Sequence, residues 1–269
     1  VIDELARMVD PTLATWSAAN VELASTAVDR ITPATSDDDR SRIEAATGLV
    51  DRSPVITEPF SEWIISGAFS AGRPQWQEVG ALFVPDTSPY QARKLTLLNG
   101  SHSLMAYAGP LRGHTTVSEA IADDTVRGWV DQWWDEACAH LPLPADTLAG
   151  YRAALLERYA NPGIQHRLAQ IAMDGSLKLP IRVLPTLRAE RAAGRMPIGA
   201  ARPLAAWVLS IRRPEGPASD PRADALVALG AGPLASAVSA LIGFLDPALA
   251  DDNALLDTVT ALAEDLQGA

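Results

Sequence analysis

Apolar positions along most of the chain recur three and four residues apart, which is the spacing of amphipathic helices. Proline, glycine and aspartate clusters divide this pattern into helices of ordinary length. Residues 21–31 and 55–57 are rich in β-branched residues and are expected to be extended, and a helix carrying Trp63 is expected to begin at Glu58. The pattern predicts a mainly α, multi-helical bundle with at most one or two short strands near the N-terminus.

The central helix is expected over residues 90–107, and Lys94, Asn99 and His102 lie within nine residues of this apolar run. In α-helical geometry Asn99 and His102 share one face. Lys94 is five residues before Asn99, so the three polar groups spread over roughly 140° of the helix. Leucines fall inside the same arc, which indicates a mostly buried helix with polar groups set among apolar ones.

Such surroundings favour acid–base chemistry. Desolvation disfavours a charged ammonium, so a buried lysine has a lowered pKa and can take a proton near neutral pH. An amide and an imidazole beside it can hold an oxygen that gains negative charge. The alternative is structural, because lysine can extend to solvent and asparagine and histidine can be satisfied within a fold. The spacing alone leaves both interpretations open.

Composition narrows the class of protein. The 269 residues carry a net charge of -11, which argues against nucleic acid as a partner because phosphate binding needs clustered Lys and Arg. One cysteine, Cys138, excludes an intramolecular disulfide and fits the cytoplasm. No apolar run reaches the roughly 18 residues of a membrane span. The chain opens without methionine in a helical pattern, which is typical of a piece of a longer protein.

A nucleotide or metal site is harder to find. Gly230–Ala235 superficially fits a GxGxxA pattern, but it lies in an alanine-rich helical region and Pro233 lacks an amide donor. We interpret it as a helix end and restart. His114, His140 and His166 are scattered, and no paired His or Cys spacing predicts a metal site.

Several motifs resemble those of one enzyme family. The run Lys94-Leu95-x-Leu97-Leu98-Asn99-Gly100-Ser101-His102-Ser103 resembles the signature helix of the polyol-specific long-chain dehydrogenases, the mannitol 2-dehydrogenase group with fructuronate and tagaturonate reductases as relatives. The resemblance covers most of the chain. It continues in Val28-Asp29-Arg30-Ile31-Thr32-Pro33, Glu58-Pro59-Phe60-x-x-Trp63, Tyr159-Ala160-Asn161-Pro162 and Ile171-Ala172-Met173-Asp174-Gly175-Ser176-x-Lys178-Leu179-Pro180.

The resemblance implies a fold and a domain organisation. Residues 36–269 would be an all-helical substrate and catalytic domain like the C-terminal domain of 6-phosphogluconate dehydrogenase, and residues 1–35 the tail of an interdomain segment. The N-terminal Rossmann domain would be absent from this chain. NAD or NADP would bind mainly to that domain, so the fragment would be inactive without it, and the residue that distinguishes the two cofactors would lie outside the chain.

The resemblance also implies roles for three residues of the central helix. Lys94 would be the general acid–base, Asn99 would hold the alkoxide or carbonyl oxygen, and His102 would orient the substrate. The family's lysine chemistry is zinc-independent, so no metal is expected.

Three further positions match substrate contacts of the family: Asp29, Lys178 and Gln170. Gln170 stands where a mannitol dehydrogenase has a substrate-binding arginine. Gln91 replaces a glutamate thought to gate proton exchange, and glutamine cannot carry a proton at neutral pH. Proton release must therefore take another route or be slower, and the departure at Gln170 puts mannitol itself in doubt.

The expected function is NAD(P)-dependent oxidation of a mannitol-like sugar alcohol to its ketose in the cytoplasm, with the reverse reduction. A hexuronate reductase, acting on fructuronate or tagaturonate, is the close alternative. From a different class, the isolated chain would be a non-catalytic helical module that dimerises or binds a polyol. Small-molecule substrates are the expected partners, with no nucleic acid and no membrane; the sequence does not predict the oligomeric state.

Overall fold

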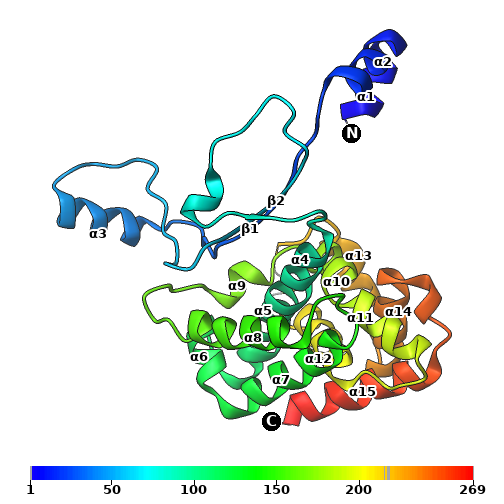
Figure 1. Cartoon of the computed structure of the whole chain (residues 1–269). Helices are drawn as coiled ribbons and strands as arrows, with labels where there is room; N and C mark the ends of the chain where they lie inside the picture. The colour runs from blue at the N-terminus through cyan, green and yellow to red at the C-terminus, as the bar shows by residue number, and fades with distance from the viewer. Residues whose placement is uncertain (1, 215, 217–218, 269) are drawn as a thin grey trace. The chain divides into compact units, whose positions relative to one another are not determined.

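The computed structural model describes residues 2–214, 216 and 219–268. The chain divides into two compact units, which are described separately. The first comprises Val1–Ile31 and Pro59–Gln91, and the second comprises Thr32–Glu58 and Ala92–Ala269. Figure 1 shows the order of their helices and strands along the chain.

The first unit opens with two helices that pack on each other, α1 (Ile2–Val9) and α2 (Pro11–Asn20). Asp10 separates them: its side chain accepts a hydrogen bond from the Thr12 backbone N–H at 2.8 Å, and Pro11 takes the first helical position. A side-chain cap followed by proline stops one helix and starts another. The 3-10 turn η1 (Trp76–Val79) and the start of α4 (Ser88–Arg93) also belong to this unit.

One small sheet completes the unit, with strands β1 (Ser25–Asp29), β2 (Glu62–Ser66) and β3 (Leu82–Phe83). β1 runs antiparallel to β2, and β2 runs parallel to β3. The expected extended segment at residues 21–31 is confirmed, whereas residues 55–57 form no strand. The prediction of a helix carrying Trp63 is wrong, because aromatic and β-branched residues favour a strand when another strand is there to pair with.

The second unit is helical. In chain order its helices are α3 (Asp37–Thr47), η2 (Lys94–Gly100), α5 (Ser101–Ala108), η3 (Gly109–Arg112), α6 (Val117–Ala122), α7 (Asp124–Cys138), α8 (Ala145–Tyr159), α9 (Leu168–Ile171), α10 (Gly175–Arg182), α11 (Leu184–Ala192), α12 (Ile198–Ile211), α13 (Ala223–Leu229), α14 (Leu234–Leu245), η4 (Pro247–Leu249) and α15 (Asn253–Gly268). The prediction of a mainly α fold is confirmed, but the described residues form three short strands where at most one or two were expected.

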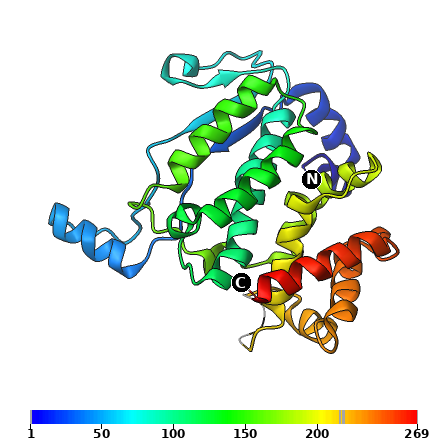
Figure 2. The same ribbon diagram turned by 90° about the horizontal axis from the view of Figure 1, so that it is seen from below.

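Helix α12 lies at the centre of this unit and packs against α5, α7 and α15 (Figure 2). Every residue of α5 is buried, and the fully buried side chains include Trp133, Trp134 and Trp207. Side chains packed this densely hold their neighbours in fixed rotamers. The core therefore gives the turn that precedes α5 a rigid support.

Within residues 2–214, 216 and 219–268, no helix combines the length and the apolar character needed to cross a lipid bilayer. The same residues contain no group of three or more His, Cys, Asp or Glu side chains arranged to hold a metal ion.

Candidate functional site

Lys94 and Asn99 lie in a π-helical turn. Helix α4, the π-helical η2 and α5 follow one another without a break, so the expected helix is confirmed but its geometry differs. π-Helical hydrogen bonds join residues five apart, which is the separation of Lys94 and Asn99. The two residues therefore lie one turn apart on the same side of the helix, rather than spread over the wide arc of an α-helix.

Side-chain donors from two other helices stabilise the widened turn. The Trp133 indole N–H donates to the Thr96 carbonyl at 3.1 Å, and the Trp134 indole N–H donates to the Leu97 carbonyl at 2.9 Å. The Tyr159 hydroxyl donates to the Leu98 carbonyl at 3.1 Å. Three successive carbonyls thus gain partners outside the helix, which offsets the poorer backbone hydrogen bonding of a π turn.

Gly100 makes room for one of these donors. A Cβ atom at this position would lie 2.6 Å from the Trp133 ring, which is closer than atoms can pack. The absence of a side chain at Gly100 admits the Trp133 indole. The glycine therefore belongs to the support of the turn.

The turn is less buried than expected. Lys94 and Asn99 are half-buried and Leu95 is exposed, whereas His102 in the following turn is only 3% exposed. The Asn99 backbone carbonyl accepts a hydrogen bond from the Ser103 hydroxyl at 3.1 Å. The polar groups of the signature helix thus run from a half-buried turn into a buried one.

His102 is packed between two rings. Its centroid lies 4.9 Å from that of Tyr159 and 5.1 Å from that of His166. Its Nε2 atom is buried and has no hydrogen-bond partner among the described residues. Burial, followed by the nearby His166 and Arg182, lowers the pKa of His102 well below its usual value. His102 is therefore a neutral imidazole with an unused ring nitrogen.

His166 is a neighbour that the sequence analysis did not connect to His102. Burial lowers the pKa of His166 to about 4. Its backbone carbonyl accepts a hydrogen bond from Val117 at 3.0 Å, beside an isolated antiparallel bridge between Thr116 and Arg167. Exposure alternates along residues 165–168, with Gln165 outward and His166 inward. This period of two in the sequence is the signal that could have placed His166 inside.

Lys178 and Gln170 lie on two neighbouring helices of the second unit, α10 and α9. Lys178 Nζ lies 3.4 Å from the Ile171 carbonyl at the end of α9, the helix that carries Gln170. Burial and then Arg182 lower the pKa of Lys178, although its Nζ also lies 3.8 Å from the Asp174 carboxylate. Helix α10, which carries Lys178, packs against η2, and α9 packs against α5. Both residues thus lie on helices that adjoin the signature helix.

Asp29 belongs to the first unit, where it ends β1 opposite Glu62 of β2. Its side chain is buried.

A buried ion pair lies next to the site. Arg158 Nη2 lies 2.8 Å from the Glu58 carboxylate and Arg158 Nε lies 3.0 Å from it, and both side chains are almost fully buried. Glu58 begins one of the resemblance motifs, and Arg158 precedes the tyrosine that supports the π turn. This ion pair thereby connects two segments that are one hundred residues apart in the sequence.

Two hollows open on the second unit, with volumes of about 940 Å³ and 510 Å³. Gln170 lines the smaller one with Arg167 and Arg42. Lys94, Asn99 and His102 line neither hollow.

The residues present do not form a dinucleotide site around Gly230–Ala235. Gly230 caps the end of α13, Gly232 has a positive φ of 81°, and Pro233 precedes α14. The interpretation as a helix end and restart is confirmed. A dinucleotide fingerprint needs a strand before the glycines, and the stretch follows a helix, so we assign none of these residues to a cofactor.

Comparison with known proteins agrees with the motifs. Residues 86–228 match the family described as the mannitol dehydrogenase C-terminal domain, and residues 1–78 match the mannitol dehydrogenase Rossmann domain. The chain is 42% identical over 199 residues to D-arabinitol 4-dehydrogenase of Ralstonia nicotianae, which covers 73% of this chain and 43% of that protein. It is 41% identical over 186 residues to D-mannonate oxidoreductase of Escherichia coli, covering 68% of this chain and 38% of that protein.

Solved structures agree as well. The Pseudomonas fluorescens mannitol 2-dehydrogenase in ternary complex with NAD and D-mannitol aligns with a TM-score of 0.82 and 31% identity, over 98% of this chain and 55% of that one. The matches thus span about two fifths of these curated relatives and about half of this solved structure. Because one family domain matches more than half of its residues, the chain belongs to the mannitol dehydrogenase family.

Proposed function

We propose that the whole protein is an NAD(P)-dependent oxidoreductase that interconverts a sugar alcohol and its ketose, with Lys94 as general acid–base. The observation that carries the proposal is the π turn, because Lys94 and Asn99 lie one turn apart on the same side of the helix and the neutral His102 lies in the turn after Asn99. Lys94 takes the proton from the substrate hydroxyl. Asn99 donates to the oxygen as it gains charge, and His102 orients the sugar chain.

The distribution of lysine supports this assignment. The chain has twenty arginines but only two lysines, Lys94 and Lys178. Arginine stays protonated in proteins, whereas lysine can exchange a proton. Both lysines stand at positions that the family resemblance assigns to the site.

NAD is the expected cofactor, because a similar structure holds NAD with D-mannitol; NADP is the alternative. The bound nicotinamide would supply the hydride acceptor. Residues 1–78 match a Rossmann domain, yet β1 and β2 are antiparallel and so do not form the parallel βαβ unit that binds a dinucleotide. We therefore propose that the nucleotide-binding domain extends beyond the part that the structure describes.

A sugar acid is the second candidate substrate. The similarity to D-mannonate oxidoreductase is as strong as the similarity to D-arabinitol 4-dehydrogenase. Gln170 and Arg167 both line the smaller hollow. Because Gln170 is uncharged, the Arg167 guanidinium would be the group that binds the carboxylate of a sugar acid.

The test is an assay of the full-length protein with NAD(H) or NADP(H) against polyols, their ketoses and hexuronates. We expect turnover with at least one polyol or hexuronate. Lys94→Ala is expected to lower turnover about a hundred- to ten-thousand-fold while leaving cofactor binding, followed by fluorescence titration, intact. Wild-type turnover in this variant would refute the role of Lys94, and inactivity of the wild type on the whole panel would favour a binding module.

A further inference from the structure

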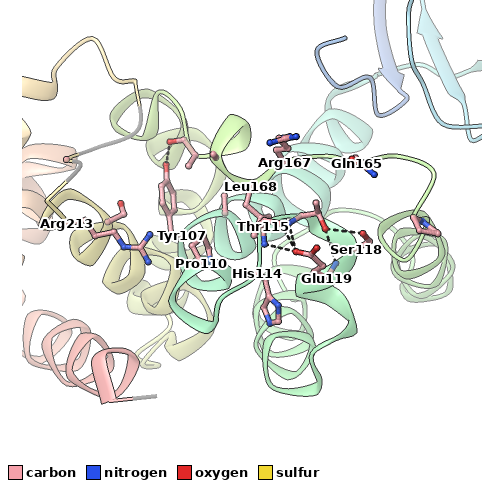
Figure 3. Close-up of a pocket in the computed structure, with 17 residues that line it drawn as sticks. Tyr107, Pro110, His114, Thr115, Ser118, Glu119, Gln165, Arg167, Leu168 and Arg213 are labelled. Atoms are coloured by element: carbon pink, nitrogen blue, oxygen red, sulfur yellow. Dashed lines mark hydrogen bonds between the residues drawn. The ribbon is translucent and has the colours of Figure 1, made fainter. Parts of the chain in front are cut away.

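The larger hollow of the second unit is separate from the residues assigned to catalysis. Its volume of about 940 Å³ lies in the range of ligand pockets. It is lined by residues at the end of α5, the start of α6, the segment through α9 and the end of α12 (Figure 3). No residue of η2 lines it.

Two acid–base groups of this pocket are already committed to structure. The Glu119 carboxylate accepts hydrogen bonds from the Thr115 backbone N–H at 2.7 Å and from the Thr116 backbone N–H at 3.1 Å. These contacts, with the Thr115 backbone bond the largest, lower the pKa of Glu119. His114 Nε2 lies 2.9 Å from the Asp123 carboxylate. The pocket is thus equipped to bind a molecule rather than to transform one.

The pocket has two arginines, Arg167 and Arg213, and Arg167 also lines the smaller hollow. Figure 3 shows Arg213 on one side of Tyr107 and Arg167 on the other. Neither guanidinium makes a hydrogen bond or ion pair with any residue of 2–214, 216 or 219–268. The backbone at Arg167 is nevertheless fixed. Arg167 forms an isolated β-bridge with Thr116, and the backbone N–H of Leu168 donates a hydrogen bond to the Thr115 carbonyl at 2.9 Å.

Many arginines of this chain have partners within the fold, whereas Arg167 and Arg213 have none among the described residues. The net charge of the chain is -11, and several other arginines, such as Arg112, Arg191 and Arg195, bind a carboxylate within the fold. Arginine is the side chain best suited to carboxylate and phosphate, because its planar donors bind two oxygens at once. Two such groups on one hollow form a site for negative charge.

The rest of the pocket is largely apolar. Pro110, Leu168 and Ala172 line it, and the Tyr107 hydroxyl is turned to the Ala172 carbonyl at 2.9 Å, which leaves its ring to the pocket. We propose that this pocket binds a small organic anion. Arg167 and Arg213 hold its carboxylate or phosphate, and its apolar body lies on Leu168, Pro110 and the Tyr107 ring.

Phenyl phosphate carries both an anionic group and an apolar ring and serves as the probe. Its binding to the whole chain is measured by titration calorimetry. Inorganic phosphate supplies the charge alone, and benzyl alcohol supplies the apolar body alone. We expect phenyl phosphate to bind at least ten-fold more tightly than either. Arg167→Gln and Arg213→Gln should each weaken phenyl phosphate at least ten-fold, and Arg167→Lys should weaken it less.

Arg127→Gln is the matched control, because Arg127 is an exposed arginine on α7 that does not line the pocket. It should leave the affinity within two-fold of wild type, and thermal denaturation should show all variants folded. The proposal is overturned if phenyl phosphate does not bind at millimolar concentration, or if the pocket variants bind it as tightly as Arg127→Gln does. It does not rest on Lys94, so it can fail while the proposed oxidoreductase stands.

Discussion

His102 is a buried ring and His166 a half-buried one, and burial lowers the pKa of both. Each keeps a buried ring nitrogen without a hydrogen-bond partner among the described residues, His102 Nε2 and His166 Nδ1. An unsatisfied buried polar atom costs about 1–3 kcal/mol. Burial keeps His102 neutral, and its free ring nitrogen is what the proposed role of orienting a substrate requires.

This pair predicts a loss of stability in mild acid. The unfolded chain protonates His166 near pH 6.5, whereas burial lowers the pKa of His166 to about 4 in the folded chain. The unfolded state therefore binds more protons between these values. The stability that is present above pH 6.5 is lost as the pH falls toward 4, by about 2 kcal/mol at pH 5.

Urea denaturation at pH 7.5 and pH 5 measures this loss. In His166→Phe, which keeps a ring in place, the difference in unfolding free energy between the two pH values should shrink. Part of it should persist, because the pKa of His102 is also lowered. The same pH dependence in His166→Phe and wild type would contradict this account.

At the scale of elements, the π turn depends on donors from α7 and α8. Trp134→Phe keeps an aromatic ring but removes the indole N–H that reaches the Leu97 carbonyl. We expect this variant to lose about 1–3 kcal/mol of unfolding free energy. Turnover of the full-length protein should fall as well, because the side chains of Lys94 and Asn99 are then no longer held at fixed positions relative to each other.

Trp16→Phe is the control, because Trp16 on α2 is 57% exposed. It should change the unfolding free energy by less than about 0.5 kcal/mol. Equal stability of the Trp134 and Trp16 variants, measured by urea denaturation, would mean that the indole donor does not hold the turn.

Sequence periodicity predicts the helix through residues 90–107 but not its π turn. Periodicity reports which residues face the core, and the turn is decided by Trp133, Trp134 and Tyr159, which are distant in the sequence. The strand at Trp63 was missed for a similar reason, because only its pairing with β1 distinguishes it from a short apolar helix. Local caps such as Asp10 were predictable, since their partners are two residues away.

At the scale of the second unit, the buried pair of Glu58 and Arg158 joins the segment before β2 to α8. Glu58→Gln should leave the Arg158 charge buried without its carboxylate, at a cost of about 3–5 kcal/mol. Replacing both residues, Glu58→Gln with Arg158→Met, should recover part of this loss, because neither position of the pair then carries a charge. Thermal and urea denaturation measure both variants.

Arg152 provides the comparison for this pair, since its partner Asp135 has a side chain that is 70% exposed. Arg152→Met should cost less than about 1 kcal/mol, as surface ion pairs do. A loss in Glu58→Gln no larger than in Arg152→Met would show that the buried pair does not join these segments.

The central claim concerns a proton carried by the amine of Lys94, and rescue of that amine tests it most directly. Turnover of full-length Lys94→Ala should fall about a hundred- to ten-thousand-fold. Added methylamine, a small base that fits the vacated space, should restore turnover in proportion to its concentration without changing the affinity for NAD. Turnover within two-fold of wild type in Lys94→Ala without added amine would contradict the account.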